Sequence, residues 1–355
     1  MRKSHFDKKT VLVCGGCGFI GSNFIRQILA QSAGVRIINL DKLTYSGNKD
    51  NLNEFIHDNR YVFIRGDIAD KKRLGSVFKA YDPSYVINFA AETHVDRSIH
   101  VGALEFLKTN VEGVFNLLET VKNSKNVKKY VQVSTDEVYG SLAINSVKKF
   151  KESTSFSPNV PYAATKAGGD LLCNAYYSTW KVPVVVTHCS NNYGPYQYPE
   201  KIIPFFISRM LENKKLPLYG DGKNVRDWIY VLDHCAALEA CLLYGRAGDV
   251  YNIGADNELN NLKIARHILK YFKRGDSWLE FVADRPGHDR RYGIDHSKIR
   301  KELGWKPRHQ FEKAFKETVH WYLRNPKWID RIRKKTGIFN PHIDLWRAHN
   351  TKTKQ

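Results

Sequence analysis

A short apolar run is followed at once by a loop with glycine at every third position, and then by a helical pattern. The stretch is VLVCGGCGFIGS, residues 11–22, in which Gly15, Gly18 and Gly21 share this spacing. Glycines placed in this way allow a tight turn and let a phosphate approach the backbone at the positive end of a helix. The pattern therefore predicts a parallel α/β sheet that carries a dinucleotide-binding loop.

Apolar runs of strand length alternate with helical patterns through the first half of the chain. The predicted strands are Thr10–Cys14, Val35–Leu40, Tyr61–Arg65, Tyr85–Ala90 and Tyr130–Ser134, and the predicted helices are Phe19–Gln31, Asp70–Ala80 and Ala103–Asn123. Runs that are apolar on both faces suit buried parallel strands, and the alternation implies right-handed crossovers. We therefore expect an α/β fold with a Rossmann-like, doubly wound parallel sheet and a smaller C-terminal α/β substrate-binding region.

The amino-acid composition changes near residue 190. Val182–His188 has the pattern of one more apolar strand, whereas the residues after Asn191 are richer in Gly, Pro, Tyr and charge. We expect a Rossmann-like NAD-binding domain over residues 1–190, a substrate-binding region over residues 191–330 and a C-terminal tail over residues 331–355. Segments near 230–255 are apolar and are expected to return to the main sheet.

The glycine loop also contains a CxxC pair, Cys14 and Cys17. A metal site needs two further ligands, and the other four cysteines are single and distant, at positions 173, 189, 235 and 241. A redox pair needs an exposed place at a helix N-terminus, which a pyrophosphate would occupy here. We therefore expect no metal site, with Cys14 buried at the end of its strand and Cys17 a small side chain beside the pyrophosphate.

The chain is strongly basic, with 56 Lys and Arg against 36 Asp and Glu, a formal net charge of +20. Such a surface attracts anions, nucleic acid among them. The basic residues are scattered, however, and no nucleic-acid-binding motif accompanies them, so an anionic small molecule is the favoured partner. No apolar run has the length of a membrane span and the start of the chain lacks an apolar signal core, so we expect a cytoplasmic protein.

An acidic residue follows the second predicted strand at the spacing of a ribose-binding carboxylate. Asp41 lies about twenty residues after the glycine loop, where it would accept hydrogen bonds from the adenosine ribose and repel a 2′-phosphate. NAD is therefore favoured over NADP. Asp67 and Ile68 follow the third strand and would flank the adenine, and the small residues of Phe89–Ala91 leave room for a cofactor after the fourth.

Two further motifs follow the fifth strand. Ser134–Gly140, STDEVYG, places two adjacent carboxylates at a strand end, where ligands bind in open α/β sheets; from the residues alone, an acid–base pair and a solvated acidic turn are equally good explanations. Tyr162 and Lys166 stand at i and i+4 of a predicted helix, and an ammonium beside the phenol would lower the pKa of Tyr162 toward that of a base. With the glycine loop, Asp41 and Thr135, these motifs are typical of the extended short-chain dehydrogenase/reductase superfamily.

Within that superfamily the chain resembles the dTDP-glucose 4,6-dehydratase family from Thr10 to about Trp321. The resemblance rests on GGCGFIGS, LDKLTYSGN, FAAETHVDRSI, STDEVYG, YAATK, SNNYGPYQYPEKIIP, YGDGKNVRDWIYVLDH, YNIGADNELNN and DRPGHDRRYGID. It implies a hydro-lyase of rhamnose-type deoxysugar biosynthesis with tightly bound NAD. The implied reaction is oxidation at C4 of the hexose, loss of water across C5 and C6, and hydride return to C6.

The same resemblance implies a role for each matching residue. Tyr162, helped by Lys166 and Thr135, would accept the C4 hydroxyl proton, Glu137 would remove the C5 proton and Asp136 would protonate the departing C6 hydroxyl. The implied cofactor-binding residues are Gly15, Gly18, Phe19, Ile20, Gly21, Asp41, Lys42, Thr44, Asp67, Ile68, Phe89, Ala90, Ala91, Thr93, Thr109, Tyr162, Lys166 and Asn192. The implied substrate-binding residues are Thr93, Thr135, Asn191, Glu200, Lys201, Ile202, Pro217, Leu218, Tyr219, Arg226, Asn261, Asp284, Arg285 and His288.

Several alternatives stay open from the sequence. Arg226 could form an ion pair with its neighbour Asp227 rather than bind a diphosphate, and Asn261 could be a helix N-cap. The substrate could be UDP-glucose, or the enzyme a UDP-sugar epimerase or 5,6-dehydratase; a basic NAD-sensing protein on a dehydrogenase scaffold is a different class. The family resemblance also implies a homodimer, for which Ala103–Asn123 and Tyr162–Tyr177 are the candidate helices.

Overall fold

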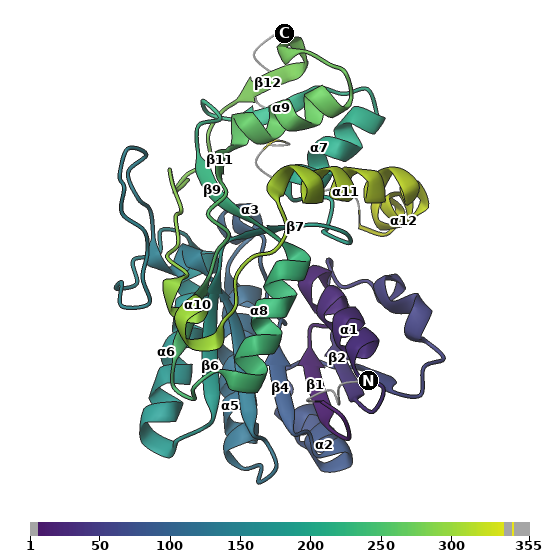
Figure 1. The fold of residues 1–355 in the computed structure, drawn as a ribbon, viewed down its shortest axis with the longest axis vertical. Coiled ribbons are helices and arrows are strands. Elements are labelled where there is room, and N and C mark those ends of the chain that lie inside the picture. The colour runs from purple at the N-terminus through teal and green to yellow at the C-terminus, as the bar shows by residue number, and fades with distance from the viewer. Residues whose placement is uncertain (1–5, 337–342, 344–355) are drawn as a thin grey trace.

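Seven parallel strands form the central sheet of the computed structural model, which describes residues 6–336 and residue 343 (Figure 1). The sheet has the order β10-β6-β5-β4-β1-β2-β3. The strands are β1 Thr10–Cys14, β2 Arg36–Asp41, β3 Tyr61–Arg65, β4 Tyr85–Asn88, β5 Lys129–Thr135, β6 Val184–Cys189 and β10 Val250–Ile253. The expected doubly wound parallel sheet is therefore confirmed, and each predicted strand lies within a few residues of its observed bounds.

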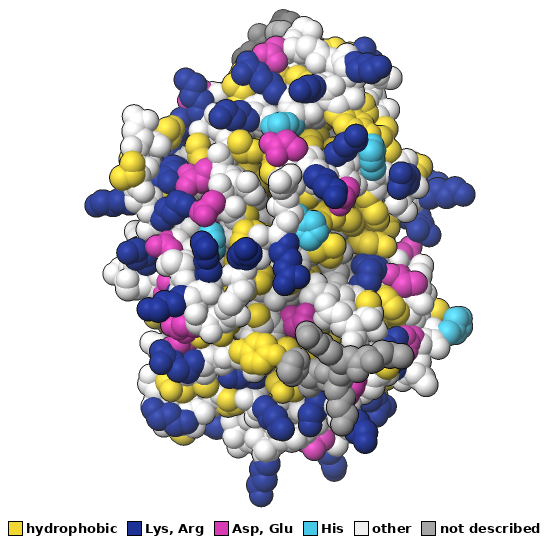
Figure 2. Space-filling view, viewed as in Figure 1, with side chains coloured by type: hydrophobic (Ala, Val, Ile, Leu, Met, Phe, Trp, Pro, Cys, Tyr) yellow, Lys and Arg dark blue, Asp and Glu magenta, His cyan; other side chains and the backbone are white. Residues whose placement is uncertain are grey.

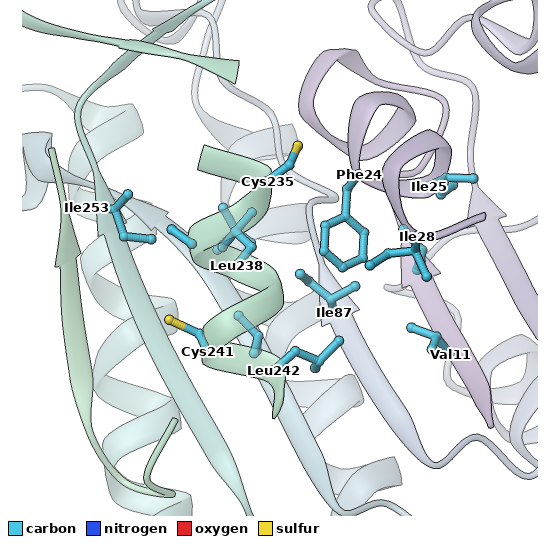
Figure 3. Packing of buried hydrophobic residues seen from close by; sticks show 14 of the residues in the cluster. Val11, Phe24, Ile25, Ile28, Ile87, Cys235, Leu238, Cys241, Leu242 and Ile253 are labelled. Carbon is cyan, nitrogen blue, oxygen red and sulfur yellow. The ribbon is translucent and has the colours of Figure 1, made fainter. Parts of the chain in front are cut away.

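Helices cover both faces of this sheet. One face carries α1 Phe19–Gln31, α8 Val231–Tyr244 and α10 Ser297–Leu303, and the other carries α2 Lys71–Tyr81, α5 Val114–Lys122 and α6 Pro161–Trp180. Figure 3 shows Phe24 and Ile28 of α1 meeting Leu238 and Leu242 of α8 above Ile87 of β4. Burial of such aliphatic and aromatic side chains is the main force that fixes the helices on the sheet.

The segment predicted as one helix over Ala103–Asn123 contains both α-helical and π-helical parts. The structure divides it into α4 Leu104–Leu107, the π-helical segment η2 Lys108–Gly113 and α5. Short π segments insert an extra residue per turn and are frequent beside functional sites. The preceding α3, Val95–His100, is a separate short helix that the sequence pattern does not predict.

A second part of the molecule lies beyond the carboxyl ends of the strands (Figure 1). It contains two small sheets, of orders β11-β9-β7 and β12-β8. Its strands are β7 Asn191–Tyr193, β8 Leu216–Tyr219, β9 Val225–Tyr230, β11 Glu258–Asn260 and β12 Leu279–Val282, and its helices are α7 Ile202–Leu211, α9 Asn261–Tyr271, α11 Phe311–Arg324 and α12 Pro326–Thr336. Short 3-10 segments complete the chain: η1 Lys49–Phe55, η3 Asp136–Tyr139 and η4 Asp276–Trp278.

The chain passes more than once between these two parts. After leaving the sheet at Cys189 it forms β7, α7, β8 and β9, and it returns through α8 to β10, which pairs with β6. Helix α12 continues to Thr336, past the expected start of the tail at residue 331. The rest of that tail, residues 337–342 and 344–355, lies outside the described residues.

The surface seen in Figure 2 carries Lys and Arg side chains over its whole extent, with Asp and Glu among them. The positive charge is thus spread and does not form one stripe on this face. Across the described helices, none combines the length and the apolar composition that crossing a membrane requires.

Candidate active site

A glycine loop and two strand ends form the first pocket. Gly15 has φ +76°, and a Cβ atom on it would lie 2.5 Å from the backbone nitrogen of Ala90 on the neighbouring loop. Gly18 is the N-cap of α1, so the amide groups that begin this helix face the pocket without a side chain in the way. This cradle accepts a group that approaches the backbone closely, as a pyrophosphate does.

The carboxylate of Asp41 lines the outer end of this cradle. One oxygen accepts a hydrogen bond from the backbone of Cys17 at 2.8 Å and the other from the backbone of Leu43 at 2.7 Å. Lys42 pairs with Asp67 at 2.8 Å on the same rim. The two adjoining pockets together contain every predicted cofactor-binding residue: Gly15, Gly18, Phe19, Ile20, Gly21, Asp41, Lys42, Thr44, Asp67, Ile68, Phe89, Ala90, Ala91, Thr93, Thr109, Tyr162, Lys166 and Asn192.

The cysteines of the loop point away from this cradle. Cys14 is fully buried, as predicted, and burial raises the pKa of its thiol far above the ordinary value. Cys17 is also fully buried, and its sulfur accepts a hydrogen bond from Asn39 at 3.3 Å. The expectation of a Cys17 side chain beside the pyrophosphate is therefore wrong, because the side chain turns inward and only its backbone faces Asp41. All six cysteines are free and buried.

The predicted catalytic residues come together in one pocket of about 250 Å³. Strand β5 ends at Thr135 and runs directly into η3, which carries Asp136 and Glu137. Helix α6 places Tyr162 and Lys166 on the same face, one turn apart. All five residues line the pocket, so two local elements on opposite sides bring their chemistry to one point.

The electrostatics of Tyr162 differ from the sequence-based expectation. Burial is the main cause that raises the pKa of Tyr162 well above its ordinary value, the charge of Glu137 adds to it, and a hydrogen bond with Thr135 opposes it. The ammonium of Lys166 donates to the carbonyl of Val133 at 2.7 Å, and burial lowers the pKa of Lys166. The expected lowering of the Tyr162 pKa is therefore wrong for this structure, since burial has the largest effect and raises it.

The two adjacent carboxyl groups have different surroundings: Asp136 is buried and Glu137 is half-buried. Burial raises the pKa of Asp136 well above its ordinary value, the charge of Glu137 raises it further, and its Oδ2 atom has no hydrogen-bond partner among the described residues. Burial also raises the pKa of Glu137, but the positive charges of Arg285, Arg226 and Lys201 oppose that rise. The site thus favours the protonated form more strongly at Asp136 than at Glu137.

A second pocket adjoins the first at Glu137, on the side of the smaller part of the molecule. It contains most of the predicted substrate-binding residues: Asn191, Glu200, Lys201, Ile202, Pro217, Leu218, Tyr219, Arg226, Asn261, Arg285 and His288. Thr93 and Thr135 line the first pocket instead. Asp284 lines neither of them; its carboxylate lies 2.5 Å from the ring of His288 and holds that side chain.

The structure decides the two local alternatives for this pocket. Arg226 donates to the carbonyls of Val225 and Asp289, at 2.8 and 3.0 Å. The carboxylate of Asp227 instead accepts hydrogen bonds from backbone amides, so the ion pair between these neighbours is not formed. The N-cap of α9 is Asn260, which leaves Asn261 as the first helical residue with its side chain on the pocket.

Several pocket residues were missed by sequence reasoning. Asp96 of α3 accepts hydrogen bonds from Tyr219 at 2.8 Å and from Arg285 at 2.7 Å, and so joins two predicted substrate residues. Tyr292 lies under Arg226, 4.1 Å from the guanidinium carbon, and its hydroxyl is 3.5 Å from Glu137. These residues come from a short helix and a loop whose sequence has no periodic signal. Among the described residues, no cluster of His, Cys, Asp and Glu could hold a metal ion.

Comparison with known proteins places this site in context. A model of the GDP-mannose 4,6 dehydratase family matches residues 12–318. The dTDP-glucose 4,6-dehydratase of Xanthomonas campestris pv. campestris (strain B100) is 44% identical over 340 residues, which cover 91% of this chain and 95% of that protein.

Two solved structures extend the similarity to three dimensions. The dTDP-glucose 4,6-dehydratase of Bacillus anthracis in complex with NAD is 46% identical, with a TM-score of 0.85, and covers 91% of this chain and 99% of that one. The dTDP-glucose 4,6-dehydratase of Streptomyces venezuelae, also with NAD bound, is 44% identical with a TM-score of 0.87 and the same coverage.

Proposed function

The chain belongs to the dTDP-glucose 4,6-dehydratase family, and on this premise we propose that it is an NAD-dependent hydro-lyase that converts dTDP-glucose to the 4-keto-6-deoxy sugar nucleotide. The observation that carries the proposal is the adjacent carboxyl pair of the buried Asp136 and the half-buried Glu137. It stands between a dinucleotide cradle and a pocket lined by cations. An oxidation at C4 needs only the cradle and a base, whereas loss of water also needs an acid and a second base.

The residues of the cradle fit NAD. A side chain at Gly15 would collide with the backbone of Ala90, so glycine keeps open the space that a pyrophosphate needs. Asp41 offers a carboxylate at the distance along the chain that suits a ribose and disfavours a 2′-phosphate. When bound, NAD supplies a reversible acceptor for the hydride that leaves C4.

Tyr162 is the group we assign to the C4 hydroxyl. Burial holds its phenol neutral, so it needs a nearby positive charge to accept a proton. Lys166 lies one turn further along α6 and is itself buried, which makes its charge effective at short range. Thr135 shares a hydrogen bond with the phenol and fixes its direction.

Asp136 and Glu137 divide the elimination between them. Loss of water from C5 and C6 requires one group to remove the C5 proton and another to give a proton to the C6 oxygen as it leaves. Three cations oppose protonation of Glu137, so it is suited to be the base. Asp136 is shielded and retains its proton, so it is suited to be the acid.

The cation-lined pocket suits a nucleoside diphosphate. Arg226, Arg285 and Lys201 lie on its walls, and guanidinium groups bind diphosphate oxygens well. Pro217–Tyr219 form a flat, largely apolar wall that can receive a base. The family relationship favours thymidine over uridine as the nucleoside.

Product analysis with dTDP-glucose and UDP-glucose side by side tests the proposal. We expect a 4-keto-6-deoxy product, detected by its absorbance in alkali and by mass, to form faster from dTDP-glucose. A product epimerised at C4 with no loss of water would contradict the assigned reaction. Faster turnover of UDP-glucose than of dTDP-glucose would contradict the assigned nucleotide.

We also infer a homodimer in the cytoplasm. Exposed and half-buried apolar side chains gather on α4, η2, α5 and α6 and line one shallow groove: Leu104, Leu107, Val111, Phe115 and Leu172. Leu104 is 75% exposed and Leu107 50%, which is costly for a face that meets only water. These elements coincide with the helices expected to pair two copies, and the free thiols suit a reducing compartment.

A further inference from the structure

A buried polar cluster lies beneath the catalytic residues, on the side away from the substrate. Its members are Asp170, His188, Tyr139, Asn252 and Ser134, contributed by α6, β6, η3, β10 and β5 in that order. None is more than 5% exposed. We call it the Asp170–His188 cluster. No step assigned above uses it, and its members come from five different elements.

Short hydrogen bonds join the cluster in one chain. Ser134 donates to Asp170 at 2.6 Å, and the same carboxylate oxygen lies 3.2 Å from Nε2 of His188. Nδ1 of His188 lies 2.6 Å from the Tyr139 hydroxyl, which donates to the side-chain oxygen of Asn252 at 2.9 Å. The amide nitrogen of Asn252 donates onward to the carbonyl of Phe150, so its oxygen is the acceptor.

These partners determine where the protons are. Tyr139 has one proton and gives it to Asn252, so its oxygen must accept from Nδ1 of His188, which therefore carries a hydrogen. On the other side, Nε2 faces a carboxylate that already accepts from Ser134 and has no proton of its own to give when ionised. The contact is attractive only if Nε2 also carries a hydrogen. His188 is then an imidazolium paired with the carboxylate of Asp170.

The pair is coupled directly to the catalytic lysine. Asp170 stands one turn after Lys166 on α6, and its negative charge raises the pKa of Lys166, against the stronger lowering by burial. Lys166 donates to the carbonyl of Val133, whose neighbour Ser134 donates to Asp170. The cluster thus holds the end of β5, from which Thr135, Asp136 and Glu137 follow, in register with α6.

We propose that Asp170 and His188 are positioning residues, whose hydrogen-bonded ion pair holds the end of β5, and with it Thr135, Asp136 and Glu137, against α6. A ring without a hydrogen on Nε2 would present a lone pair to the carboxylate, and the two would repel. The other titratable groups that face the cluster are Tyr130, Asp136, Lys166, Cys173 and Cys189, together with Glu152, which accepts from the backbone of Asn252 at 3.0 Å.

A cavity of about 290 Å³ makes a matched pair of variants possible, because it opens onto Asp170 and His188 from the side away from the active site. An arginine at position 188 can extend into it and keeps a permanent charge, whereas a glutamine keeps hydrogen bonding without charge. We expect His188→Gln to lower kcat by about tenfold or more. KM and NAD affinity should stay within about threefold, since neither pocket is touched.

The arginine variant supplies the rescue. We expect His188→Arg to recover most of the wild-type kcat. Asp170→Asn should resemble His188→Gln, and the double variant should lose no more than either single one, because both break one unit. Wild-type kcat in a folded His188→Gln protein would overturn the proposal.

A measurement on the unaltered protein keeps the test independent of folding and of the substrate. In the NAD-bound wild type, the ring nitrogens of His188 should give nitrogen-15 signals of a doubly protonated imidazolium at neutral pH, assigned by their loss in His188→Arg. A bare Nε2 would refute the pair. The inference rests on the proposed function only for its rate assays. If the protein had no dehydratase activity, the proposed function would be wrong, but the protonation of the His188 ring would still test the ion pair with Asp170.

Discussion

Asp136 and Glu137 are neighbours in the sequence and have opposite tasks in the proposed reaction. The difference comes from what faces each side chain. Arg285, Arg226 and Lys201 converge on Glu137 from the smaller part of the molecule, whereas Asp136 is turned into the interior with one oxygen lacking a partner among the described residues. A sequence pattern gives the two carboxyl groups but not the long-range cations that separate their protonation.

This division makes Glu137→Gln informative. The variant keeps shape and loses the base, so it should oxidise C4 and accumulate reduced NAD while the overall rate falls by about 10²- to 10⁴-fold. Deuterium from solvent should not enter C5. Tyr162→Phe should instead block the first step and show no reduced NAD. Glu302→Gln, an exposed change outside the pockets, is the control, and normal turnover of Glu137→Gln would remove this residue from the mechanism.

Glu200 makes a second prediction, on stability. It is buried beside Tyr45, which donates to it at 3.0 Å, and burial raises its pKa to about 7. The folded protein therefore holds a proton here that the unfolded chain releases between about pH 4.5 and 7. The contribution of Glu200 to the free energy of unfolding should fall as pH rises through this window.

Glu200→Gln cannot titrate, so its stability relative to wild type should improve from pH 5 to pH 8. The gain is on the order of 1–3 kcal/mol, since a tenfold change in a proton-binding constant corresponds to about 1.4 kcal/mol. Thermal unfolding at fixed NAD and protein concentration measures it. The exposed Glu302→Gln should show no comparable trend, and a difference between Glu200→Gln and wild type that is constant with pH would contradict the assignment.

At the scale of elements, the central sheet was predictable and its connections were less so. Strands β1, β2, β4, β5 and β6 are mostly buried, the edge strand β3 is half-buried, and all six appear in the sequence as largely apolar runs. The helix over Ala103–Asn123 was predicted as regular, yet η2 inserts a π segment. Apolar spacing cannot show this, because Thr109 and Asn110 are buried polar residues. The side chain of Asn110 hydrogen-bonds to Thr165 of α6 and to the backbone of Glu92.

Most of the candidate site was also available from the sequence, for the same reason. Thr135, Tyr162 and the glycines lie at strand ends and on one helix, where spacing along the chain fixes spacing in the fold. Asp96 and Tyr292 lie on a short helix and a loop, and their places depend on contacts with residues more than a hundred positions away. Cys17 was placed on the wrong side of its loop because spacing does not fix the direction of a side chain in a turn.

Helix α6 offers a matched pair of glycines to test its packing on η2. A Cβ atom on Gly169 would lie 2.6 Å from the backbone oxygen of Asn110, whereas one on Gly168 would meet a methyl group of Val111 at 3.4 Å. We expect Gly169→Ala to cost about 1–3 kcal/mol by overpacking, and Gly168→Ala to be neutral or to gain up to about 1 kcal/mol from helix propensity.

Thermal unfolding of the two glycine variants under identical conditions measures the difference, at roughly 2–4 °C per kcal/mol for a large domain. Equal stability of Gly169→Ala and Gly168→Ala would show that α6 and η2 are not in close contact. The NAD affinity of Gly168→Ala should be unchanged, which separates packing from binding.

At the scale of the molecule, the exposed apolar groove on α4, η2, α5 and α6 predicts association of two copies. An aspartate at Leu107 or Phe115 would place charges in the shared interface, so Leu107→Asp and Phe115→Asp should be monomeric in light scattering at micromolar concentration. Val147→Asp is the control, because Val147 is 95% exposed and lies on a loop outside this groove. A wild-type protein that is monomeric at high concentration would contradict the inferred dimer.

The double passage of the chain between the sheet and the smaller part has a mechanical consequence. The segment that forms β7, α7, β8 and β9 is held at its start by β6 and at its end by α8 and β10. Strand β10 is hydrogen-bonded to β6 in the main sheet, and α8 packs on that sheet. After β10 the chain goes out again to β11 and comes back at α10 before forming α11 and α12. Because several connecting segments join the smaller part to the main sheet, the two parts have no single hinge between them. The substrate pocket should therefore admit its ligand through small movements, and the two parts should unfold together.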